Sequence, residues 1–273
     1  GGVDPNTKNY VVARYDYNLS FGGTTGWPMT VDVRGLVLKQ PYNHNVNLVK
    51  CFAFLQDMEF WEAMVGSGVA HTEASSIVDR CRFYYMYNDG VATIHDATDT
   101  TAITKLPYIT VQNCEFKSNY KGDGVSTHNT AHVSVSNSLF ENIGKHGVVS
   151  ATGDAFVYNC VIKGSNEAGV CIGGPLAGAG TQRMVVMNTH IEGSGIAAIQ
   201  CSSGAAPANS FYRIDAYNVT TKGNARAAYA ISSNSPNTAV INLHNCKGSG
   251  DTQGLVVSGV GAAINNTTYN SYS

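Results

Sequence analysis

One short phrase recurs along this chain and limits the folds that it can adopt. It consists of a strand-like apolar stretch with one small residue, a polar turn, and then glycine followed by a β-branched residue. It reads Val-Gln-Asn-Cys-Glu-Phe at 111–116, Val-Ser-Asn-Ser-Leu-Phe at 135–140 and Val-Tyr-Asn-Cys-Val-Ile at 157–162. Repeats of 22 to 33 residues with β-branched strands are typical of a stacked solenoid. The sequence therefore predicts an all-β fold, a parallel β-helix of roughly nine coils.

The repeat also bears on domain organisation. It runs through most of the 273 residues, and no linker-like segment interrupts it. Hydrophobic residues make up 43% of the chain and charged residues 13%, so a long core can be buried beneath a weakly charged surface. We expect a single β-helix domain over residues 1–273. Because the chain opens on Gly1-Gly2, we also expect it to be a segment of a longer protein.

Charge and motif spacing exclude several classes of function. The net charge is −2 and the basic residues are scattered, so nucleic acid is not an expected partner. No apolar run approaches the roughly 20 residues of a membrane span, so membrane insertion is not expected either. Neither the ligand spacing of zinc sites nor a run of alternating calcium ligands is present. We predict no metal and no cofactor.

The seven cysteines follow the repeat. One repeat position runs through Cys51, Cys81, Cys114, Ser138, Cys160, Thr189, Asn218 and Cys246. In a parallel β-helix such residues stack about 4.8 Å apart inside the core. An odd number of cysteines is a poor disulfide framework. We therefore predict buried, free thiols.

Three polar residues directly precede the repeated glycine in successive coils, and they form the candidate catalytic group. They are Asp89, Asp123 and His146. Two carboxylates about 5 Å apart cannot both ionise freely, which suits them to acid and base roles. A histidine one coil further on can donate to a reacting oxygen or orient a carboxylate. The alternative is that Asp before Gly is ordinary turn chemistry.

Aromatic residues flank this column in the sequence. A sugar-binding groove needs them because apolar sugar faces stack on rings while carboxylates act on the glycosidic bond. Tyrosines in β-proteins also serve simply in packing. The predicted substrate-binding residues are Tyr84, Tyr85, Tyr87, Tyr120, Lys145, His128 and Glu167.

At these positions the chain resembles a known family. Asn88-Asp89-Gly90, Gly122-Asp123-Gly124-Val125 and His146-Gly147-Val148 are similar, in order, to the Asn-Thr-Asp-Gly, Asp-Asp and Gly-His-Gly motifs of the polygalacturonase-like glycoside hydrolases. More loosely, residues 80–260 resemble the pectate-lyase-like superfamily, which includes bacteriophage tailspikes and capsule depolymerases. The resemblance implies a right-handed helix, with Asp89 and Asp123 as water-activating carboxylates and His146 as their supporting histidine.

The chain departs from that family at two places. Gly122 stands where the family has the aspartate that serves as proton donor, and Cys171 and Gly173 stand where it has an Arg-x-Lys substrate clamp. The identity of the general acid therefore stays open. Candidates are His95, His128, His132, Glu141 and Glu167, or an upstream cluster of Asp57, Glu59 and Glu62 around Phe60 and Trp61.

The sequence and the resemblance together predict a tailspike-like depolymerase. It would hydrolyse a bacterial capsular or O-antigen polysaccharide in a groove along the β-helix, with retaining or inverting stereochemistry left open. The resemblance also implies a homotrimer located outside the cell, on a virion tail. One alternative is a polysaccharide lyase in which Lys121, Lys145 or Arg82 abstracts a proton beside a uronate. The other is an adhesin or virion protein that binds a glycan, such as a host receptor, without cutting it.

Overall fold

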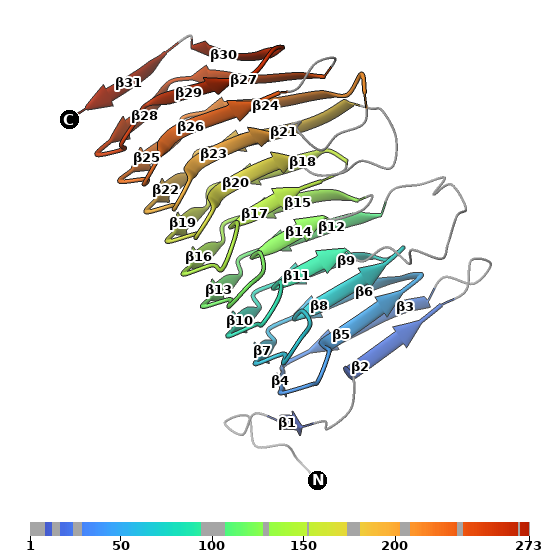
Figure 1. Ribbon diagram of the computed structural model, residues 1–273. Helices are drawn as coiled ribbons and strands as arrows, with labels where there is room; N and C mark the ends of the chain where they lie inside the picture. The colour runs from blue at the N-terminus through green and yellow to red at the C-terminus, as the bar shows by residue number, and fades with distance from the viewer. Residues whose placement is uncertain are drawn as a thin grey trace.

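The computed structural model describes residues 9–12, 17–23, 29–93, 107–127, 131–151, 153–173, 181–202, 208–233, 237–266 and 268–272. Their regular structure consists of strands that wind into a solenoid (Figure 1). Successive strands pass in turn to three sheets, which we call sheets 1, 2 and 3, and then return to the first.

Sheet 1 stacks β1 (Asn9–Val12), β4 (Leu36–Lys39), β7 (Glu59–Trp61), β10 (Arg82–Tyr84), β13 (Glu115–Lys117), β16 (Leu139–Glu141), β19 (Val161–Lys163), β22 (His190–Glu192), β25 (Thr220–Lys222), β28 (Cys246–Ser249) and β31 (Tyr269–Tyr272). Sheet 2 stacks β2 (Tyr17–Gly22), β5 (His44–Val49), β8 (Val69–Thr72), β11 (Val91–Thr93), β14 (Val125–Thr127), β17 (Val148–Ser150), β20 (Ala168–Gly173), β23 (Ala197–Ser202), β26 (Ala227–Ser232) and β29 (Leu255–Ser258). Sheet 3 stacks β3 (Met29–Arg34), β6 (Cys51–Gln56), β9 (Ser75–Asp79), β12 (Tyr108–Gln112), β15 (His132–Ser136), β18 (Ala155–Tyr158), β21 (Thr181–Met187), β24 (Phe211–Tyr217), β27 (Thr238–His244) and β30 (Ala262–Asn266).

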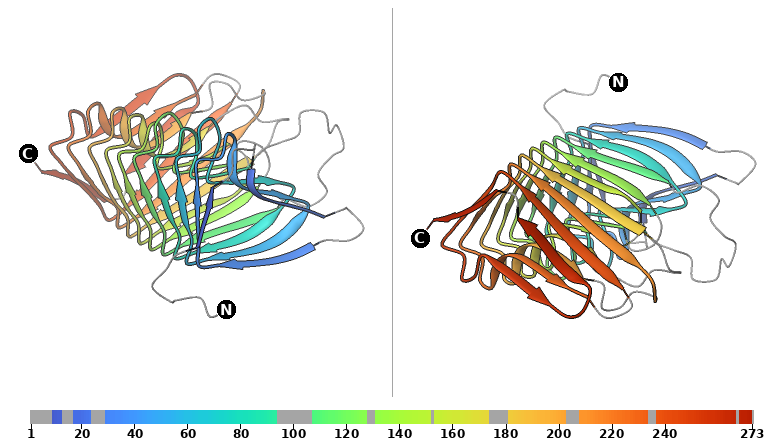
Figure 2. Two further views of the ribbon diagram at one scale, coloured as in Figure 1. Left: turned by 90° about the horizontal axis from the view of Figure 1, so that it is seen from below. Right: turned by 90° about the horizontal axis from the view of Figure 1, so that it is seen from above.

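Each strand pairs in parallel with its counterpart in the coil before and the coil after. In sheet 1, for example, Phe83 of β10 is in register with Phe60 of β7 and with Phe116 of β13. Figure 2 shows how the coils lie over one another along the axis. The predicted all-β parallel β-helix is confirmed. Within the described residues, no helix is long and apolar enough to span a membrane.

The core holds stacks of like side chains, because register places equivalent residues of successive coils over one another. Phe60, Phe83, Phe116 and Phe140 are fully buried and form a ladder whose neighbouring ring centroids lie 4.5 to 4.6 Å apart. Ile162 and Ile191 occupy the same position in the next two coils. The later coils thus continue the ladder with aliphatic residues.

The prediction of buried, free thiols is confirmed, but two of the positions assigned to the repeat are wrong. All seven cysteines are free and buried. Backbone hydrogen bonds place Met58, not Cys51, below Cys81, and Val219, not Asn218, after Thr189. Cys51 instead opens β6, in register with Met29. The interval from Cys51 to Cys81 therefore exceeds one coil, which the residue spacing alone did not reveal.

Left-handed backbone recurs in the turns of this solenoid. The row of turns that leads from sheet 3 into sheet 1 contains Asn113, Asn137, Asn159, Asn188, Asn218 and Asn245, with φ between 49° and 55°. Asparagine tolerates this conformation better than most residues. The last five asparagines also bond side chain to side chain, at distances of 2.7 to 3.3 Å. This ladder ties the later coils together at the surface.

Candidate functional site

The turns that lead into sheet 2 bring the predicted catalytic column together. Asp89, Asp123 and His146 lie in three successive coils, directly before glycines whose following valines are in register. Ala168 and Ala197 occupy the same position in the next two coils. Ser67 and His44 occupy it in the two preceding coils, where the backbone N–H of Ser67 donates to His44 Nδ1 at 2.9 Å. The polar part of the column therefore runs from His44 to His146.

A chain of hydrogen bonds links the three residues. Asp89 Oδ1 accepts the backbone N–H of Asp123 at 2.7 Å, and Asp123 Oδ1 accepts the backbone N–H of His146 at 2.9 Å. The two aspartates are only 2% and 3% exposed. Each carboxylate thus caps the turn of the following coil. A buried carboxylate with such a partner contributes to folding whether or not it also acts in catalysis.

His146 connects this buried chain to the surface. Its Nδ1 lies 2.9 Å from Asp123 Oδ1, and its Nε2 lies 3.2 Å from Glu167 Oε2. Burial of the ring opposes protonation, but the interactions with Asp123 and Cys171 outweigh it and raise the pKa of His146 to about 10. At neutral pH the ring is an imidazolium that donates to both carboxylates. The Glu167 side chain is 43% exposed, so among the hydrogen-bonded residues Asp89, Asp123, His146 and Glu167 it is the carboxylate that solvent reaches.

The structure explains the departure at Gly122. A Cβ at this position would lie 2.3 Å from the carbonyl carbon of Asn88 and 2.5 Å from Asp89 Oδ1. The carboxylate of Asp89 thus occupies the space that a side chain would need. The acid that polygalacturonase-like enzymes have at this position therefore has no room here.

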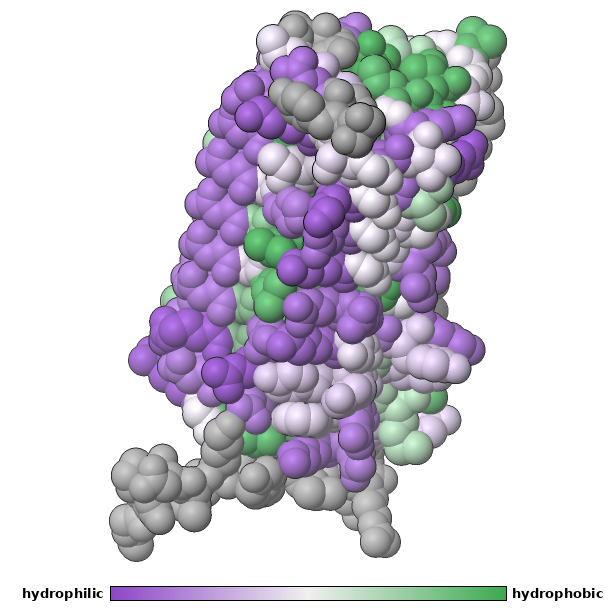
Figure 3. Space-filling model, turned by 90° about the vertical axis from the view of Figure 1, so that its left-hand side faces the viewer, coloured by the Kyte–Doolittle hydropathy of each residue, from purple (hydrophilic) through white to green (hydrophobic). Residues whose placement is uncertain are grey.

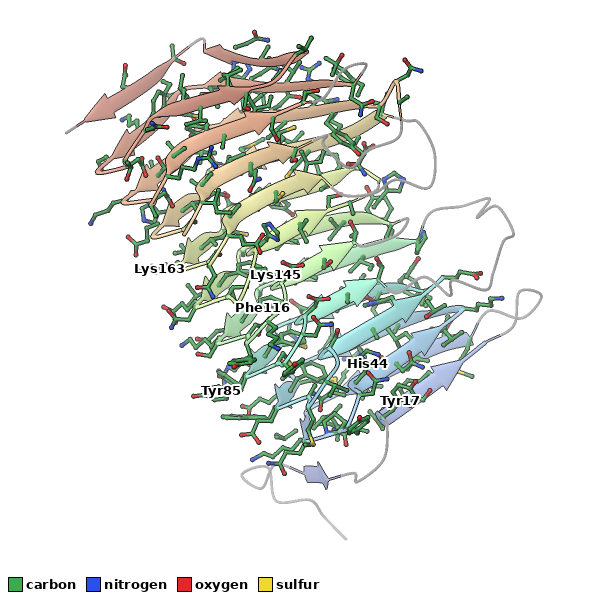
Figure 4. All side chains as sticks on the ribbon, in the orientation of Figure 1. Tyr17, His44, Tyr85, Phe116, Lys145 and Lys163 are labelled. Carbon is green, nitrogen blue, oxygen red and sulfur yellow. The ribbon has the colours of Figure 1, made fainter. Side chains whose placement is uncertain are left out.

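An open aromatic cleft lies beside the column, on the turns between sheet 1 and sheet 2. Its volume is about 330 Å³, and Tyr85, Tyr87 and Tyr120 line it. Tyr85 and Tyr120 are 56% and 69% exposed, and the rings of Tyr87 and Tyr120 lie 5.8 Å apart at their centroids. Figure 4 shows Tyr85 at the outer edge of the solenoid. Three of the four predicted tyrosines therefore meet in one cleft.

Sequence reasoning did not place the remaining walls of this cleft. Glu62, Ala63, Met64 and Ser118 complete them. The sequence signal that could have placed Glu62 in the cleft is the alignment of Glu59-Phe60-Trp61 with Arg82-Phe83-Tyr84. This alignment puts Glu62 in the same turn position as Tyr85. Of the upstream acidic cluster, Glu62 is thus the member that reaches the cleft. Gln40 Nε2 donates to its carboxylate at 2.6 Å.

The other predicted binding residues lie around the cleft or outside the described residues. Tyr84 is on the outer face of β10, where its ring packs against Trp61 with centroids 4.4 Å apart. Lys145 is exposed on the turn before His146. His128 and the candidate acid His95 lie outside the described residues.

The lysine beside the cleft is not a good base. Lys121 Nζ lies 5.1 Å from the ring centroid of Tyr87 and 5.9 Å from that of Tyr120. Its interaction with the Tyr87 hydroxyl raises the pKa of this ammonium group. An amine that holds its proton more firmly than usual is poorly suited to the proton abstraction that a lyase needs. It suits a cation packed on aromatic rings instead.

In the described part of the chain, no group of three or more His, Cys, Asp or Glu side chains is arranged to hold a metal ion.

The fold and the turn columns define a class of protein: a parallel β-helix whose candidate site lies on stacked turns. Residues 67–242 match the family model described as a right-handed β-helix region. The chain belongs to this family, and the predicted right-handed winding is confirmed. No curated protein sequence matches the chain.

Several solved structures are similar in fold at low sequence identity. A tailspike protein from Escherichia coli O157:H7 bacteriophage CAB120 is 9% identical over 84% of this chain, with a TM-score of 0.44. An α-1,3-glucanase from Streptomyces thermodiastaticus strain HF3-3 is 10% identical over 97%, also with a TM-score of 0.44. The adhesin PfbA of Streptococcus pneumoniae is 10% identical over 89% of this chain and 72% of its own, with a TM-score of 0.46. The chain spans 38% of the tailspike and 64% of the glucanase.

Proposed function

We propose that this β-helix is the glycan-binding and hydrolytic part of a tailspike-like depolymerase that acts on a bacterial capsular or O-antigen polysaccharide outside the cell. The observation that carries the proposal is the open aromatic cleft on the turns between sheet 1 and sheet 2, the same turns on which Asp89 and Asp123 stand. We also propose that the complete protein is a homotrimer with further domains.

The lining of the cleft suits a sugar chain. Exposed rings at Tyr85 and Tyr120 offer flat apolar faces, on which the C–H faces of a pyranose can stack. Glu62 and Ser118 supply oxygen atoms at the edge for hydroxyl groups. A few polar groups in a largely aromatic cleft are the usual composition of a ligand site.

For hydrolysis we assign roles along the buried chain. Glu167 is the solvent-facing carboxylate that acts on the substrate or on water, and His146 positions it by donating from Nε2. Asp123 holds the imidazolium from the other side, and Asp89 supports the Asp123 turn. Asp123 is 3% exposed, and its Oδ1 is engaged by both the backbone N–H and the ring of His146, so Glu167 is the carboxylate of this group that a substrate can reach.

A second candidate function is glycan binding without cleavage. The observation in its favour is that Asp89 and Asp123 are buried and accept backbone N–H groups, as purely structural caps would. In that case only the aromatic cleft is functional. The engagement of Lys121 with aromatic rings disfavours a lyase that uses this residue as its base.

The test uses purified protein and a panel of capsular and O-antigen polysaccharides, with retention and release of reducing ends both measured. We expect Tyr120→Ala to abolish retention of the bound polysaccharide, while Tyr108→Ala, an exposed tyrosine in sheet 3, retains it. Glu167→Gln should keep retention and stop reducing-end release. Retention without any release would leave the binding function and refute the hydrolase. An ultraviolet-absorbing unsaturated product would establish a lyase instead.

A further inference from the structure

A second cleft opens at the other end of the strands that border the aromatic cleft. It has a volume of about 470 Å³ and lies where the chain passes from sheet 3 into sheet 1. Its walls include Asp57, Arg80, Arg82, Asn113, Glu115 and Leu139. None of these belongs to the catalytic column or to the aromatic cleft.

The two clefts are joined by the same three strands. β7, β10 and β13 each begin at the second cleft and end at the aromatic cleft. In the middle coil, Cys81 borders one and Tyr85 borders the other, four residues further on. At about 3.3 Å per residue this is about 13 Å, a span of a few sugar rings rather than a remote surface. The side that carries sheet 1 is mainly hydrophilic (Figure 3).

Between the clefts lies a platform of two aromatic rings. Trp61 and Tyr84 are half-buried neighbours on the outer face of β7 and β10, with centroids 4.4 Å apart. Their polar tips are already bonded, because Trp61 Nε1 donates to Glu59 and Tyr84 Oη donates to Glu115. Trp61 also lies 6.1 Å from Tyr85. Tyr84 packs on one side of the Trp61 ring, and Lys39 Nζ lies 5.2 Å from its centroid, so the platform offers the outward apolar edges of two rings that are held in place at low entropic cost.

The charges of the second cleft are balanced. Arg80 bonds Asp57 through two nitrogens, at 2.8 and 3.0 Å. Arg82 lies 3.3 Å from Glu59 and 3.8 Å from Glu115. Both guanidinium groups are more than half exposed. Such pairs present fixed donors beside fixed acceptors, which matches pairs of sugar hydroxyls, whereas a carboxylate ligand would meet acidic groups already in place.

The same face changes character in the next coils. Where Trp61 and Tyr84 stand in β7 and β10, Lys117, Glu141 and Lys163 stand in β13, β16 and β19. Lys117 contacts Glu141 at 3.3 Å, and Lys163 contacts Glu192 at 3.2 Å. A row of mutually paired charges offers no stacking surface. The aromatic platform is thus restricted to the coils that have both clefts.

We propose that the outer face of β7 and β10 is a second glycan subsite, which takes a neutral, hydroxyl-rich segment. It carries the polysaccharide across the solenoid from the aromatic cleft to the cleft of Arg80 and Arg82. This proposal rests on glycan binding at the aromatic cleft. In this proposal the polysaccharide runs parallel to the strands, not along the axis of the β-helix.

The experiment measures retention and affinity for a panel of purified capsular and O-antigen polysaccharides, half neutral and half containing uronate, and for size-graded fragments of whichever is retained. Arg82→Ala and Trp61→Ala should each weaken binding of long fragments about tenfold, equivalent to about 1.4 kcal/mol, and leave the shortest bound fragments unaffected. Lys163→Ala is the matched control, since it removes a paired, exposed cation from the same sheet (Figure 4). Binding to the neutral polysaccharide should change little from low to high salt.

The outcomes separate the two proposals. If Tyr120→Ala abolishes binding while Arg82→Ala and Trp61→Ala bind long fragments like the wild type, the second subsite is refuted and the aromatic cleft stands. If Trp61→Ala does not fold, Arg82→Ala decides. Preference for uronate polysaccharides with a steep fall of affinity in salt would overturn the neutral assignment. Retention of no polysaccharide, or unchanged binding by Tyr120→Ala, would overturn both.

Discussion

The first and the last coils solve the same backbone problem in different ways. The turn from sheet 1 to sheet 2 has positive φ in every coil from Gln40 to Gly250. The later coils place glycine there, at Gly164, Gly193, Gly223 and Gly250, whereas the earlier coils place Gln40, Glu62, Tyr85, Ser118 and Asn142. A side chain in this conformation costs about 1 kcal/mol or more. Three of the strained residues, Glu62, Tyr85 and Ser118, line the aromatic cleft.

The difference indicates that the early coils keep strained side chains at this turn because those side chains form the aromatic cleft. An aromatic residue with φ of 58° is uncommon, and Tyr85 is also 56% exposed, so core packing does not explain it. In the later coils glycine occupies this position and removes the strain. The following predictions test this contrast between the two regions, beginning with the largest effect.

The aromatic ladder of the early coils should carry the largest share of stability. Phe83→Ala removes a fully buried ring between Phe60 and Phe116 and should lower the free energy of unfolding by about 3 to 5 kcal/mol. Ile191→Val, in the aliphatic continuation, should lower it by about 0.5 to 1.5 kcal/mol. Urea unfolding measures both. A loss well below 3 kcal/mol for Phe83→Ala would contradict the tight packing of the aromatic ladder.

Gly122 should tolerate no side chain, in contrast to the open glycine turns. Gly122→Ala should lower the free energy of unfolding by about 3 kcal/mol, because its Cβ overlaps the backbone of Asn88 and the carboxylate of Asp89. Gly223→Ala has nothing within 4 Å and should show only the backbone strain, about 1 kcal/mol. A stable Gly122→Ala protein would mean that Asp89 does not occupy this space.

The His146 chain should make the stability of the early coils depend on pH. The pKa of His146 is raised from its ordinary value to about 10, so its stabilising effect is fully present below about pH 6.5 and is lost as the pH rises through about 10. The stability difference between wild type and His146→Gln, measured by urea unfolding, should therefore be largest at mildly acidic pH and shrink toward pH 10. A difference that grows with pH would contradict the imidazolium.

The strained turn at Tyr85 should show the smallest effect on stability, and it tests the contrast most directly. Tyr85→Gly should raise the free energy of unfolding by about 1 kcal/mol and weaken glycan retention, since it removes both the strain and a wall of the cleft. The reciprocal change, Gly193→Ala, should lower the free energy of unfolding by about as much, because its Cβ meets only ordinary contacts. If Tyr85→Gly were destabilising, the tyrosine would be held there by packing.

Much of this architecture could be predicted from the sequence, because a solenoid repeats its contacts with its residues. The phrase around Cys114, Ser138 and Cys160 predicted the coils correctly. Cys51 was assigned to the wrong position because it opens β6, the sheet 3 strand of its coil, whereas Met58 follows that strand as Cys114 follows β12. The sequence also predicted three residues of the aromatic cleft, Tyr85, Tyr87 and Tyr120.

The rest depends on neighbours that the sequence does not specify. Asp89 and Asp123 are buried because the turn of the next coil donates an N–H to each, and a single repeat gives no sign of that partner. The second cleft brings together Asp57, Arg80 and Asn113, which occupy one turn position in three coils of unequal length. Only the register of the coils unites them.

The distribution of the seven buried thiols gives the molecule a built-in set of reporters. They occur from Cys51 to Cys246 and are all protected in the folded state, and burial raises the pKa of Cys160 to about 11. In a linear array of coils, each segment can open with its own probability. The rate at which an alkylating reagent reaches each cysteine, read out by mass spectrometry, would therefore map local opening along the axis from Cys51 to Cys246 without an introduced label. Such a map would reveal whether the array melts from one end, from both, or at the coils that carry the strained turns.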